Sequence, residues 1–336
     1  MTFYQTRLSR KEFRQGFVFD MDSPYEGHHL PRFILPHGCN GFSHIPKRFV
    51  SDLCLRPDFP LTSKRATSAF TFAAGVQWFE AYEAAKQHNR VIVGGFSARG
   101  SVGAAGGWVS GGGHSSMAPN YGLGTSNLPQ RPTRSYSHDD FVGVDNVLEM
   151  TIVTADGNHI VANSYSNPDL FWALRGGGGG TWGVITSVTY RTHPSTPFSA
   201  AFILVNSTNP TSTQNLLTEI IRLTPSLVEQ GYGGYGGGSI DQLQFFVLSP
   251  NVTAEQTQAT FIPLFDFALS QEGFQVQNYT VVFDDFWKFY DAIWNVDGQA
   301  GYAEEISSWL LPKEVVKTDK PEQLAAELLK ISGFGY

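Results

Sequence analysis

Two glycine-rich stretches dominate the sequence: SVGAAGGWVSGGGH runs from Ser101 to His114, and LRGGGGGTWG runs from Leu174 to Gly183. Glycine is needed where the backbone takes a positive φ or approaches another group closely, and it costs conformational entropy elsewhere. Loops of this kind present main-chain N–H groups that can hold an anion. The sequence therefore favours a backbone-lined ligand site, with tight turns alone as the plainer alternative.

These glycines do not match common nucleotide motifs in the expected context. Gly178–Gly183 fits G-x-G-x-x-G, but a nicotinamide fingerprint opens a helix, whereas we expect a strand at 183–190. Gly95–Ser101 has the spacing of a phosphate-binding loop without its lysine. Neither G-x-S-x-G nor H-E-x-x-H occurs. A nicotinamide dehydrogenase is therefore disfavoured.

Strand and helix patterns alternate along the rest of the chain, which predicts an α+β fold. Residues 1–40 are interpreted as mostly loop and the Gly/Tyr segment 232–238 as a loop, and a domain boundary is expected near Thr196. We expect strands at 70–75, 91–93, 148–154, 158–162, 183–190, 200–205, 243–248 and 279–283, and helices at 76–88, 170–174, 214–228, 254–270 and 287–294.

Composition narrows the class of protein. The 336 residues suggest about two domains, and the net charge of −7 disfavours a nucleic-acid partner. No stretch has the length of a membrane span. Cys39 and Cys54 permit at most one intrachain disulfide, so a cysteine-rich metal site is excluded, and we predict no metal. Met1–Arg14 shows no signal peptide, although three N-glycosylation sequons lean slightly towards secretion.

Several motifs together resemble the FAD domain of berberine-bridge-enzyme-like oxidases, within the vanillyl-alcohol-oxidase superfamily. They read GSVGAAGGWVSGGGHS, YGLG…VDNVLEM, VTADG, NPDLFWALRGGGGGTWGVIT and SVTYRTHP, and AGVQWFEAYEAAKQHNRVIVGG resembles the preceding strand and helix of fungal members. The resemblance runs from about Ala69 to Pro194. It implies a PCMH-type FAD-binding domain, mainly its second subdomain, followed by a partial substrate domain built on an antiparallel sheet with helices.

On this resemblance the chain divides into an N-terminal remnant at 1–68, the FAD-binding domain at 69–196 and the partial substrate domain at 197–336. Segments 42–68 and 125–140 interrupt the family pattern with basic, proline-bearing, loop-like sequence. Two explanations stay open for them, namely translated non-coding sequence from a gene-model error and long surface insertions. Relative to the family, we expect the chain to be truncated.

The resemblance implies FAD as the cofactor and assigns segments to its parts. The loop 102–114 would run along the pyrophosphate and the flavin, Asp145 and Asn146 would lie near the flavin, and 183–185 would contact the adenine side through backbone groups. The predicted cofactor-binding residues are Ser101, Val102, Gly103, Gly106, Gly107, Gly111, Gly112, Gly113, His114, Gly124, Asp145, Asn146, Gly183, Val184 and Ile185.

Individual side chains near these segments have more than one interpretation. Trp108 and Trp182 are expected to pack beneath the cofactor. His114 either bonds near the phosphates or ribose or is structural, and for Arg175 we favour an ion pair with Asp169 over a contact with the cofactor.

The sequence departs from the family where covalent attachment and catalysis are expected. It lacks the R-x-x-G-H-D-like segment whose histidine bonds the flavin, and it lacks the cysteine before the glycine loop. The family's catalytic base would lie beyond Tyr336, so no catalytic residue is assigned. Tyr235, Tyr279 and Asp284 are conceivable substrate contacts, but ordinary core or surface roles are favoured.

The resemblance implies an FAD-dependent oxidase that moves a hydride from an alcohol, sugar or amine-type substrate to flavin N5, with O2 as the acceptor. Its partners would be a small-molecule substrate and O2, without nucleic acid or membrane, and the protein would be a secreted monomer. The alternative is a non-catalytic remnant with weak or no FAD binding. A carbohydrate-binding module would explain the aromatic residues and sequons but not the glycine loops.

Overall fold

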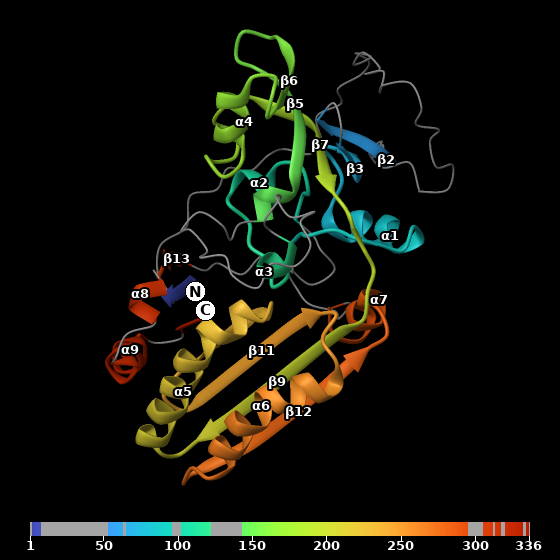
Figure 1. Ribbon diagram of the computed structural model, residues 1–336. Helices are drawn as coiled ribbons and strands as arrows, with labels where there is room; N and C mark the ends of the chain where they lie inside the picture. Colours follow the sequence, from blue (N-terminus) through green and yellow to red (C-terminus); the bar gives the residue numbers. More distant parts are fainter. Residues whose placement is uncertain are drawn as a thin grey trace, which may run out of the picture.

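The computed structural model describes residues 2–7, 53–62, 65–95, 102–121, 143–294, 305–311, 313–316, 320–331 and 334–335. These residues form two large antiparallel sheets and one two-stranded sheet, with helices packed on the large ones, which confirms the predicted α+β class (Figure 1). None of the helices in this part of the chain has the length and hydropathy that a membrane span requires.

The five-stranded sheet belongs to the part that contains the glycine clusters. Its order is β2 (Leu53–Thr62), β3 (Arg65–Ala73), β7 (Val184–Arg191), β5 (Val147–Val153) and β6 (His159–Asn163). Aromatic and aliphatic side chains on one face pack against helix α1 (Trp78–Gln87) in a shared core. The helix and the β5–β6 hairpin agree with the predictions for 76–88, 148–154 and 158–162.

Short elements surround this sheet at the ends of its strands. They are β4 (Arg90–Val91), which pairs with β8 (His193–Pro194), the helical turns α2 (Gly107–Ser110), α3 (Ala118–Tyr121) and α4 (Pro168–Leu174), and the 3₁₀ turn η2 (Gly143–Asn146). The segment 125–140 lies outside the described residues.

The expectation that 42–68 lacks regular structure is wrong for its second half. Strand β2 pairs antiparallel with β3, and both begin before residue 69. The two prolines of this stretch, Pro57 and Pro60, led to the loop interpretation. Strand β2 is at the sheet edge, and its register shifts lie between Arg56 and Phe59 and between Pro60 and Thr62. Edge strands and bulges are the places where a sheet accepts proline.

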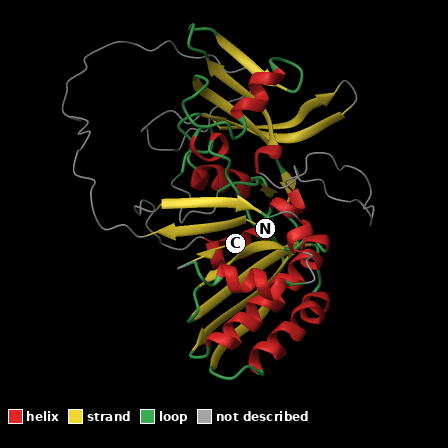
Figure 2. Ribbon diagram, turned by 90° about the vertical axis from the view of Figure 1, so that its left-hand side faces the viewer, coloured by secondary structure: helices red, strands yellow, loops and turns green. Residues whose placement is uncertain are grey.

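The seven-stranded sheet forms the other part of the molecule. Its order is β12 (Phe274–Phe283), β9 (Phe198–Ser207), β11 (Gln242–Pro250), β10 (Gly233–Gly238), β14 (Phe334–Gly335), β1 (Thr2–Arg7) and β13 (Glu305–Leu310). Helices α5 (Pro210–Glu229) and α6 (Ala254–Leu269) lie on one face of it (Figures 1 and 2). Two further helices, α8 (Lys313–Val316) and α9 (Pro321–Leu328), lie near the C-terminal end of the chain. The predicted boundary near Thr196 stays a prediction, because residues from both parts share one core cluster.

Two segments interpreted as loops are strands of this sheet. Strand β1 pairs with β13 and β14, so Thr2–Arg7 joins the sheet of the C-terminal part. Strand β10 pairs with β11 although it is mostly glycine. A Cβ on Gly233 would lie 2.1 Å from the carbonyl oxygen of Ser116, and the side chain of Asn120 donates to the carbonyl oxygen of Gly231. Glycine is needed here because the α3 segment packs directly on the strand.

An aromatic helix connects the two sheets. Helix α7 (Phe286–Phe289) continues into the π-helical turn η3 (Tyr290–Trp294). The ring of Phe289 stacks on Phe198 and Phe246 of the seven-stranded sheet, with centroids 6.2 and 6.1 Å apart. Tyr290 packs against Tyr82 of α1 at 5.3 Å. The α7–η3 segment is therefore a wedge between the two parts.

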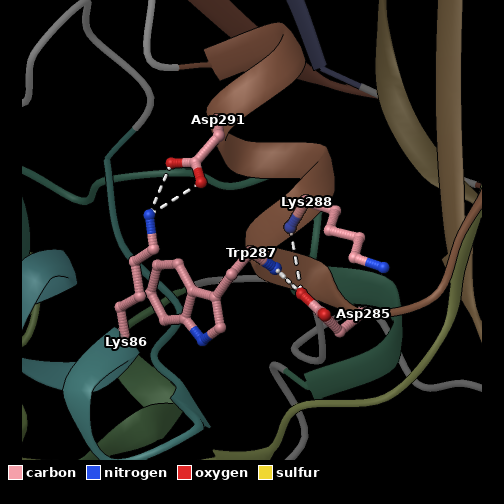
Figure 3. A network of polar contacts seen from close by, with 5 residues as sticks. All are labelled: Lys86, Asp285, Trp287, Lys288 and Asp291. Atoms are coloured by element: carbon pink, nitrogen blue, oxygen red, sulfur yellow. Dashed lines mark hydrogen bonds and ion pairs between the residues drawn. The ribbon is translucent and has the colours of Figure 1, made fainter.

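Polar contacts fix the wedge at its exposed side. Asp285 accepts hydrogen bonds from the backbone N–H groups of Trp287 and Lys288 and so caps α7 (Figure 3). One turn further on, the ammonium group of Lys86 binds both carboxylate oxygens of Asp291 at 2.8 and 2.7 Å. The ion pair ties the end of α1 to η3.

We expect Phe289→Ala to lower the free energy of unfolding by about 3–5 kcal/mol, because the buried ring leaves a cavity between the two parts. Asp291→Asn is the control, and its loss is expected to stay below about 1 kcal/mol because the Lys86 pair is partly exposed. Urea denaturation followed by circular dichroism measures both. Equal losses for the two variants would contradict the wedge.

Candidate functional site

Two tryptophans hold the first glycine cluster in place. The rings of Trp78 and Trp108 meet edge to face with centroids 5.1 Å apart. A Cβ on Gly113 would lie 2.3 Å from atom Cδ2 of Trp108, and one on Gly94 would lie 2.3 Å from Trp78. Real Cβ atoms do not come that close, so the loop follows the indole rings only because these positions are glycine. Trp108 is buried, as packing beneath a ligand requires.

The second glycine cluster lies directly against the first. The N–H of Gly178 donates to the carbonyl oxygen of Ser110 at 2.9 Å. A Cβ on Gly176 would lie 3.7 Å from the Cα of Gly112. Both glycines have positive φ, 114° and 77°, so each turns its backbone in a way that other residues rarely adopt. Together the clusters form a largely exposed cradle of main-chain groups.

Asp145 and Arg175 lie beside this cradle. Arg175 ends α4 directly before Gly176, and its guanidinium lies over the ring of Phe171 at 4.4 Å. Burial lowers the pKa of Arg175, and the charge of Asp145 raises it. The charge that acts on Arg175 is therefore that of Asp145. The sequence had predicted an ion pair with Asp169 instead.

Two buried polar groups at the cradle have unused hydrogen-bonding capacity. Neither atom Nε of Arg175 nor atom Nδ2 of Asn146 has a hydrogen-bond partner among the described residues. A buried donor without a partner costs free energy. Donors of this kind fit a ligand that brings acceptor oxygens, such as phosphate or flavin carbonyl groups.

His193 holds Asn146 from the other side. Its Nε2–H donates to Oδ1 of Asn146 at 2.8 Å, and its ring packs on Tyr121 with centroids 4.3 Å apart. Burial and the neighbouring charges of Arg191 and Arg90 lower the pKa of His193 to about 3. The imidazole is neutral at physiological pH, so it positions Asn146 without adding charge.

The predicted adenine segment lies apart from the other predicted residues. Gly183, with φ of 138°, directly precedes β7, and a Cβ there would lie 2.3 Å from the carbonyl oxygen of Val153. Val153 is the last residue of β5, whereas Asn146 directly precedes the first residue of that strand. The seven residues of β5 separate them by roughly 20 Å. Val184 is 70% exposed, so this end of the sheet is accessible.

His114 carries the glycine loop onto the other sheet. Its Nδ1 is hydrogen-bonded to the hydroxyl group of Tyr235 at 3.0 Å, and the two rings meet edge to face. Desolvation of its ring lowers the pKa of His114. The contact joins the cradle to β10 of the seven-stranded sheet.

The structure therefore brings together most of the predicted site. The segments 102–114 and 176–178 and the pair Asp145–Asn146 converge, while 183–185 lies at the far end of β5. Ser101 and Gly124 lie outside the described residues. Trp182 is 44% exposed, and its Nε1 lies 3.1 Å from where a Cβ on Gly177 would be, so its packing beneath the cofactor stays a prediction. Asp284 forms an exposed ion pair with Lys288.

Sequence reasoning missed the contribution of Gly94 and His193. The sequence predicts a strand at 91–93, but it does not predict that Trp78 packs on the backbone of Gly94. The available signal was the tryptophan that begins α1, one strand away from a glycine pair. No group of three or more metal-binding side chains occurs in the ranges that the structure describes.

Comparison with known proteins agrees with this geometry. The chain is 37% identical over 227 residues to an FAD-linked oxidoreductase of Arthroderma benhamiae, covering 66% of this chain and 36% of that protein. It is 31% identical over 293 residues to the FAD-linked oxidoreductase ffsJ of Aspergillus flavipes, covering 84% and 43%. No family model matches the chain.

The fold is that of a VAO-type flavoprotein. The crystal structure of MtVAO615 from Myceliophthora thermophila C1 superposes with a TM-score of 0.61 at 27% identity, over 75% of this chain and 42% of that one. The chain belongs to the vanillyl-alcohol-oxidase superfamily of FAD-linked oxidoreductases, which confirms the resemblance. It spans less than half the length of these three relatives.

Gly113→Ala is expected to disturb the cradle, because its Cβ has no room against Trp108. We expect a loss of about 2 kcal/mol or more in the free energy of unfolding, in the range of overpacked cores, and a change in tryptophan fluorescence. Gly179→Ala is the matched control, because nothing lies within 4 Å of its Cβ, and it should change stability by less than about 0.5 kcal/mol. Indifference of both stability and fluorescence to Gly113→Ala would contradict the packing described.

His193 predicts a pH dependence of stability. Its pKa is about 3 in the folded protein and 6.5 when unperturbed, so the unfolded chain binds more protons as the pH falls below 6.5. The free energy of unfolding should therefore fall towards low pH, by at most about 1.4 kcal/mol per pH unit from this group.

The variant His193→Gln cannot titrate. Urea denaturation between pH 7.5 and 4.5 should give a shallower pH dependence for the variant than for the unchanged protein. Parallel curves for the two proteins would contradict a buried neutral imidazole.

Proposed function

We propose that the chain binds FAD in the cradle of its two glycine clusters and works as an FAD-dependent oxidase. The observation that carries the proposal is the packing of the two clusters, with the N–H of Gly178 bound to Ser110 and positive φ at Gly112 and Gly176. Backbone amides in such turns suit a pyrophosphate group. The relatives, an FAD-linked oxidoreductase and a VAO-type flavoprotein, support the same cofactor.

The residues present divide the work of holding the cofactor. The amide of Asn146 and the guanidinium of Arg175 offer buried donors to acceptor oxygens, and His193 holds Asn146 in position. Trp108 supports the loop from below. When bound, FAD supplies the hydride acceptor for an alcohol, sugar or amine-type substrate and passes the electrons to O2. The chain contributes binding and orientation.

The test of cofactor binding is an absorbance spectrum of the full chain after incubation with FAD and removal of the excess. We expect the bands of oxidised flavin to stay with the protein and to leave it on denaturation, because the family's covalent attachment residues are not found. A colourless protein would favour the remnant, the alternative that the relatives do not favour.

A matched pair of variants separates the cradle from general strain. Gly112 and Gly157 have nearly equal positive φ, 77° and 82°, and a Cβ on either meets nothing within 4 Å. Both Gly112→Leu and Gly157→Leu should cost about 1–2 kcal/mol of stability. Only Gly112→Leu should lose flavin binding, because Gly157 lies in the β5–β6 turn. Equal retention by both variants would place the flavin elsewhere.

The acceptor is tested with the reconstituted protein, independently of the substrate. Chemically reduced flavin on the protein is mixed with air-saturated buffer, and its reoxidation is followed by absorbance. Rapid reoxidation, faster than that of the same protein with an artificial acceptor under nitrogen, supports an oxidase. Reoxidation by the artificial acceptor alone would make the protein a dehydrogenase.

A further inference from the structure

Three asparagines of the chain stand in sequons that the proposed function does not use. They are Asn206, Asn251 and Asn278, and each is followed two residues later by threonine, without proline between. Such a triplet is the acceptor motif for an N-linked glycan, which is bulky and has to project from the surface of the folded protein. The three asparagines differ in their backbone and surroundings, so the structure can distinguish between them.

Asn278 is in the interior of strand β12, on the side that faces the helices. It is paired with Ile203 of β9, which is buried in the core cluster beneath α5 and α6. Directly paired residues point to the same face of a sheet, and α6 packs along this face of β12 (Figure 1). The side chain of Asn278 is half-buried. A glycan on its amide would lie between strand and helix, so the folded chain does not accommodate one there.

Asn206 is exposed, but it lies within the sheet and strands flank it on both sides. It is paired with Gln242 of β11 and with Gln275 of β12. Its Oδ1 accepts a hydrogen bond from Nε2 of Gln242 at 2.8 Å. The hydroxyl group of Thr208, the third residue of this sequon, donates to the carbonyl oxygen of Gly273 at 3.2 Å. Both ends of the sequon are engaged in the sheet, and a glycan on Nδ2 of Asn206 would crowd the paired glutamines.

Asn251 is in the turn between β11 and α6. Its φ is 58°, in the left-handed region, which asparagine adopts more readily than most residues. The backbone N–H of Asn251 donates to the carbonyl oxygen of Pro197 at 2.9 Å, so the turn is fixed by its backbone, and the side chain is exposed. Strand β11 ends at Pro250. Asn251 therefore lies beyond the sheet, and its amide has room for a glycan.

The third residue of this sequon, Thr253, is also at the surface and begins α6. Its Oγ1 accepts from the backbone N–H of Gln256 at 3.2 Å, and the side chain of Gln256 accepts from the backbone N–H of Thr253 at 3.0 Å. This capping box stabilises the first turn of the helix. The turn needs a residue that adopts positive φ at position 251 and an N-cap at position 253. Glycine meets the first need, and aspartate or serine meets the second, so variants can separate the sequon from the turn.

We propose that Asn251 is the N-glycosylated residue of the folded chain and that Asn206 and Asn278 stay unmodified. In the secretory pathway, Nδ2 of Asn251 forms a bond to C1 of the first N-acetylglucosamine of a lipid-linked oligosaccharide. The bond from C1 to the lipid diphosphate breaks, the diphosphate leaves with the bonding electrons, and the amide loses one proton. Nothing is oxidised or reduced. The inference does not involve the cradle or FAD, so it stands or falls independently of the proposed function.

The test is expression of the full chain, behind a cleavable secretion signal, in a yeast that attaches N-glycans. Peptide N-glycosidase F leaves aspartate where a glycosylated asparagine was, so peptide mass spectrometry locates each occupied site, and an untreated sample controls for spontaneous deamidation. The chain is recovered from the medium and from the endoplasmic reticulum, so poor secretion does not prevent the measurement. We expect aspartate at position 251 in both fractions and asparagine at 206 and 278 in the secreted chain. Unmodified Asn251, or a glycan on either other asparagine of the secreted chain, would overturn the proposal.

Matched variants separate the sequon from the structure of the turn. Asn251→Gly keeps the positive φ and Thr253→Asp keeps the N-cap, but each deletes the sequon, so each should abolish the change in gel mobility that the glycosidase causes. Thr253→Ser keeps both the cap and the sequon and should retain the glycan. Asn206→Gln is the control, because it removes another sequon and keeps an amide at the same position. Persistence of the mobility change in Asn251→Gly, or its loss in Asn206→Gln, would overturn the assignment.

Discussion

The contact on which the rest of the site depends is the packing of Trp78 and Trp108 against bare backbone. Each indole lies where a Cβ on Gly94 or Gly113 would be 2.3 Å away. The tryptophans fill the space under the loop, and the missing side chains let the loop come close enough to cover them. The tryptophans support the loop from one side. Its other side contacts the second glycine cluster, and His114 of the loop contacts the seven-stranded sheet.

A second constraint is the packing between the two large sheets. The aromatic wedge of α7 and η3 belongs to the same core as α1 and the start of β9, so the two parts share buried surface and are not joined by a linker alone. On the opposite side, α3 packs on β10 at Gly231 and Gly233. With supports on both sides, the His114–Tyr235 contact lies at a junction that neither part forms alone.

Much of the fold was readable from the sequence, and the failures have specific causes. Helix α1 and the β5–β6 hairpin follow periodic patterns that local chemistry produces. Strand β10 has no such pattern, because its glycines make room for α3, which packs on the strand from another part of the chain. Strand β2 was hidden by prolines that an edge strand accepts. Patterns in the local sequence do not reveal contacts with distant parts of the chain or the position of a strand in its sheet.

The candidate site divides in the same way. The glycine clusters predicted the cradle, because so many glycines in a short stretch indicate a backbone that takes positive φ or approaches another group closely. The aromatic row across the seven-stranded sheet could not be predicted, because Tyr235, Phe246, Phe202 and Tyr279 stand on four separate strands and only the strand register aligns them. Its two ends also differ in support. Tyr235 and Phe246 are held by His114 and Phe289, whereas Tyr279 lies on an edge strand with Phe202 as its ring partner. The end of the row nearest the glycine loop is therefore held by side chains from outside the sheet, whereas its far end is held by strand pairing and one ring stack.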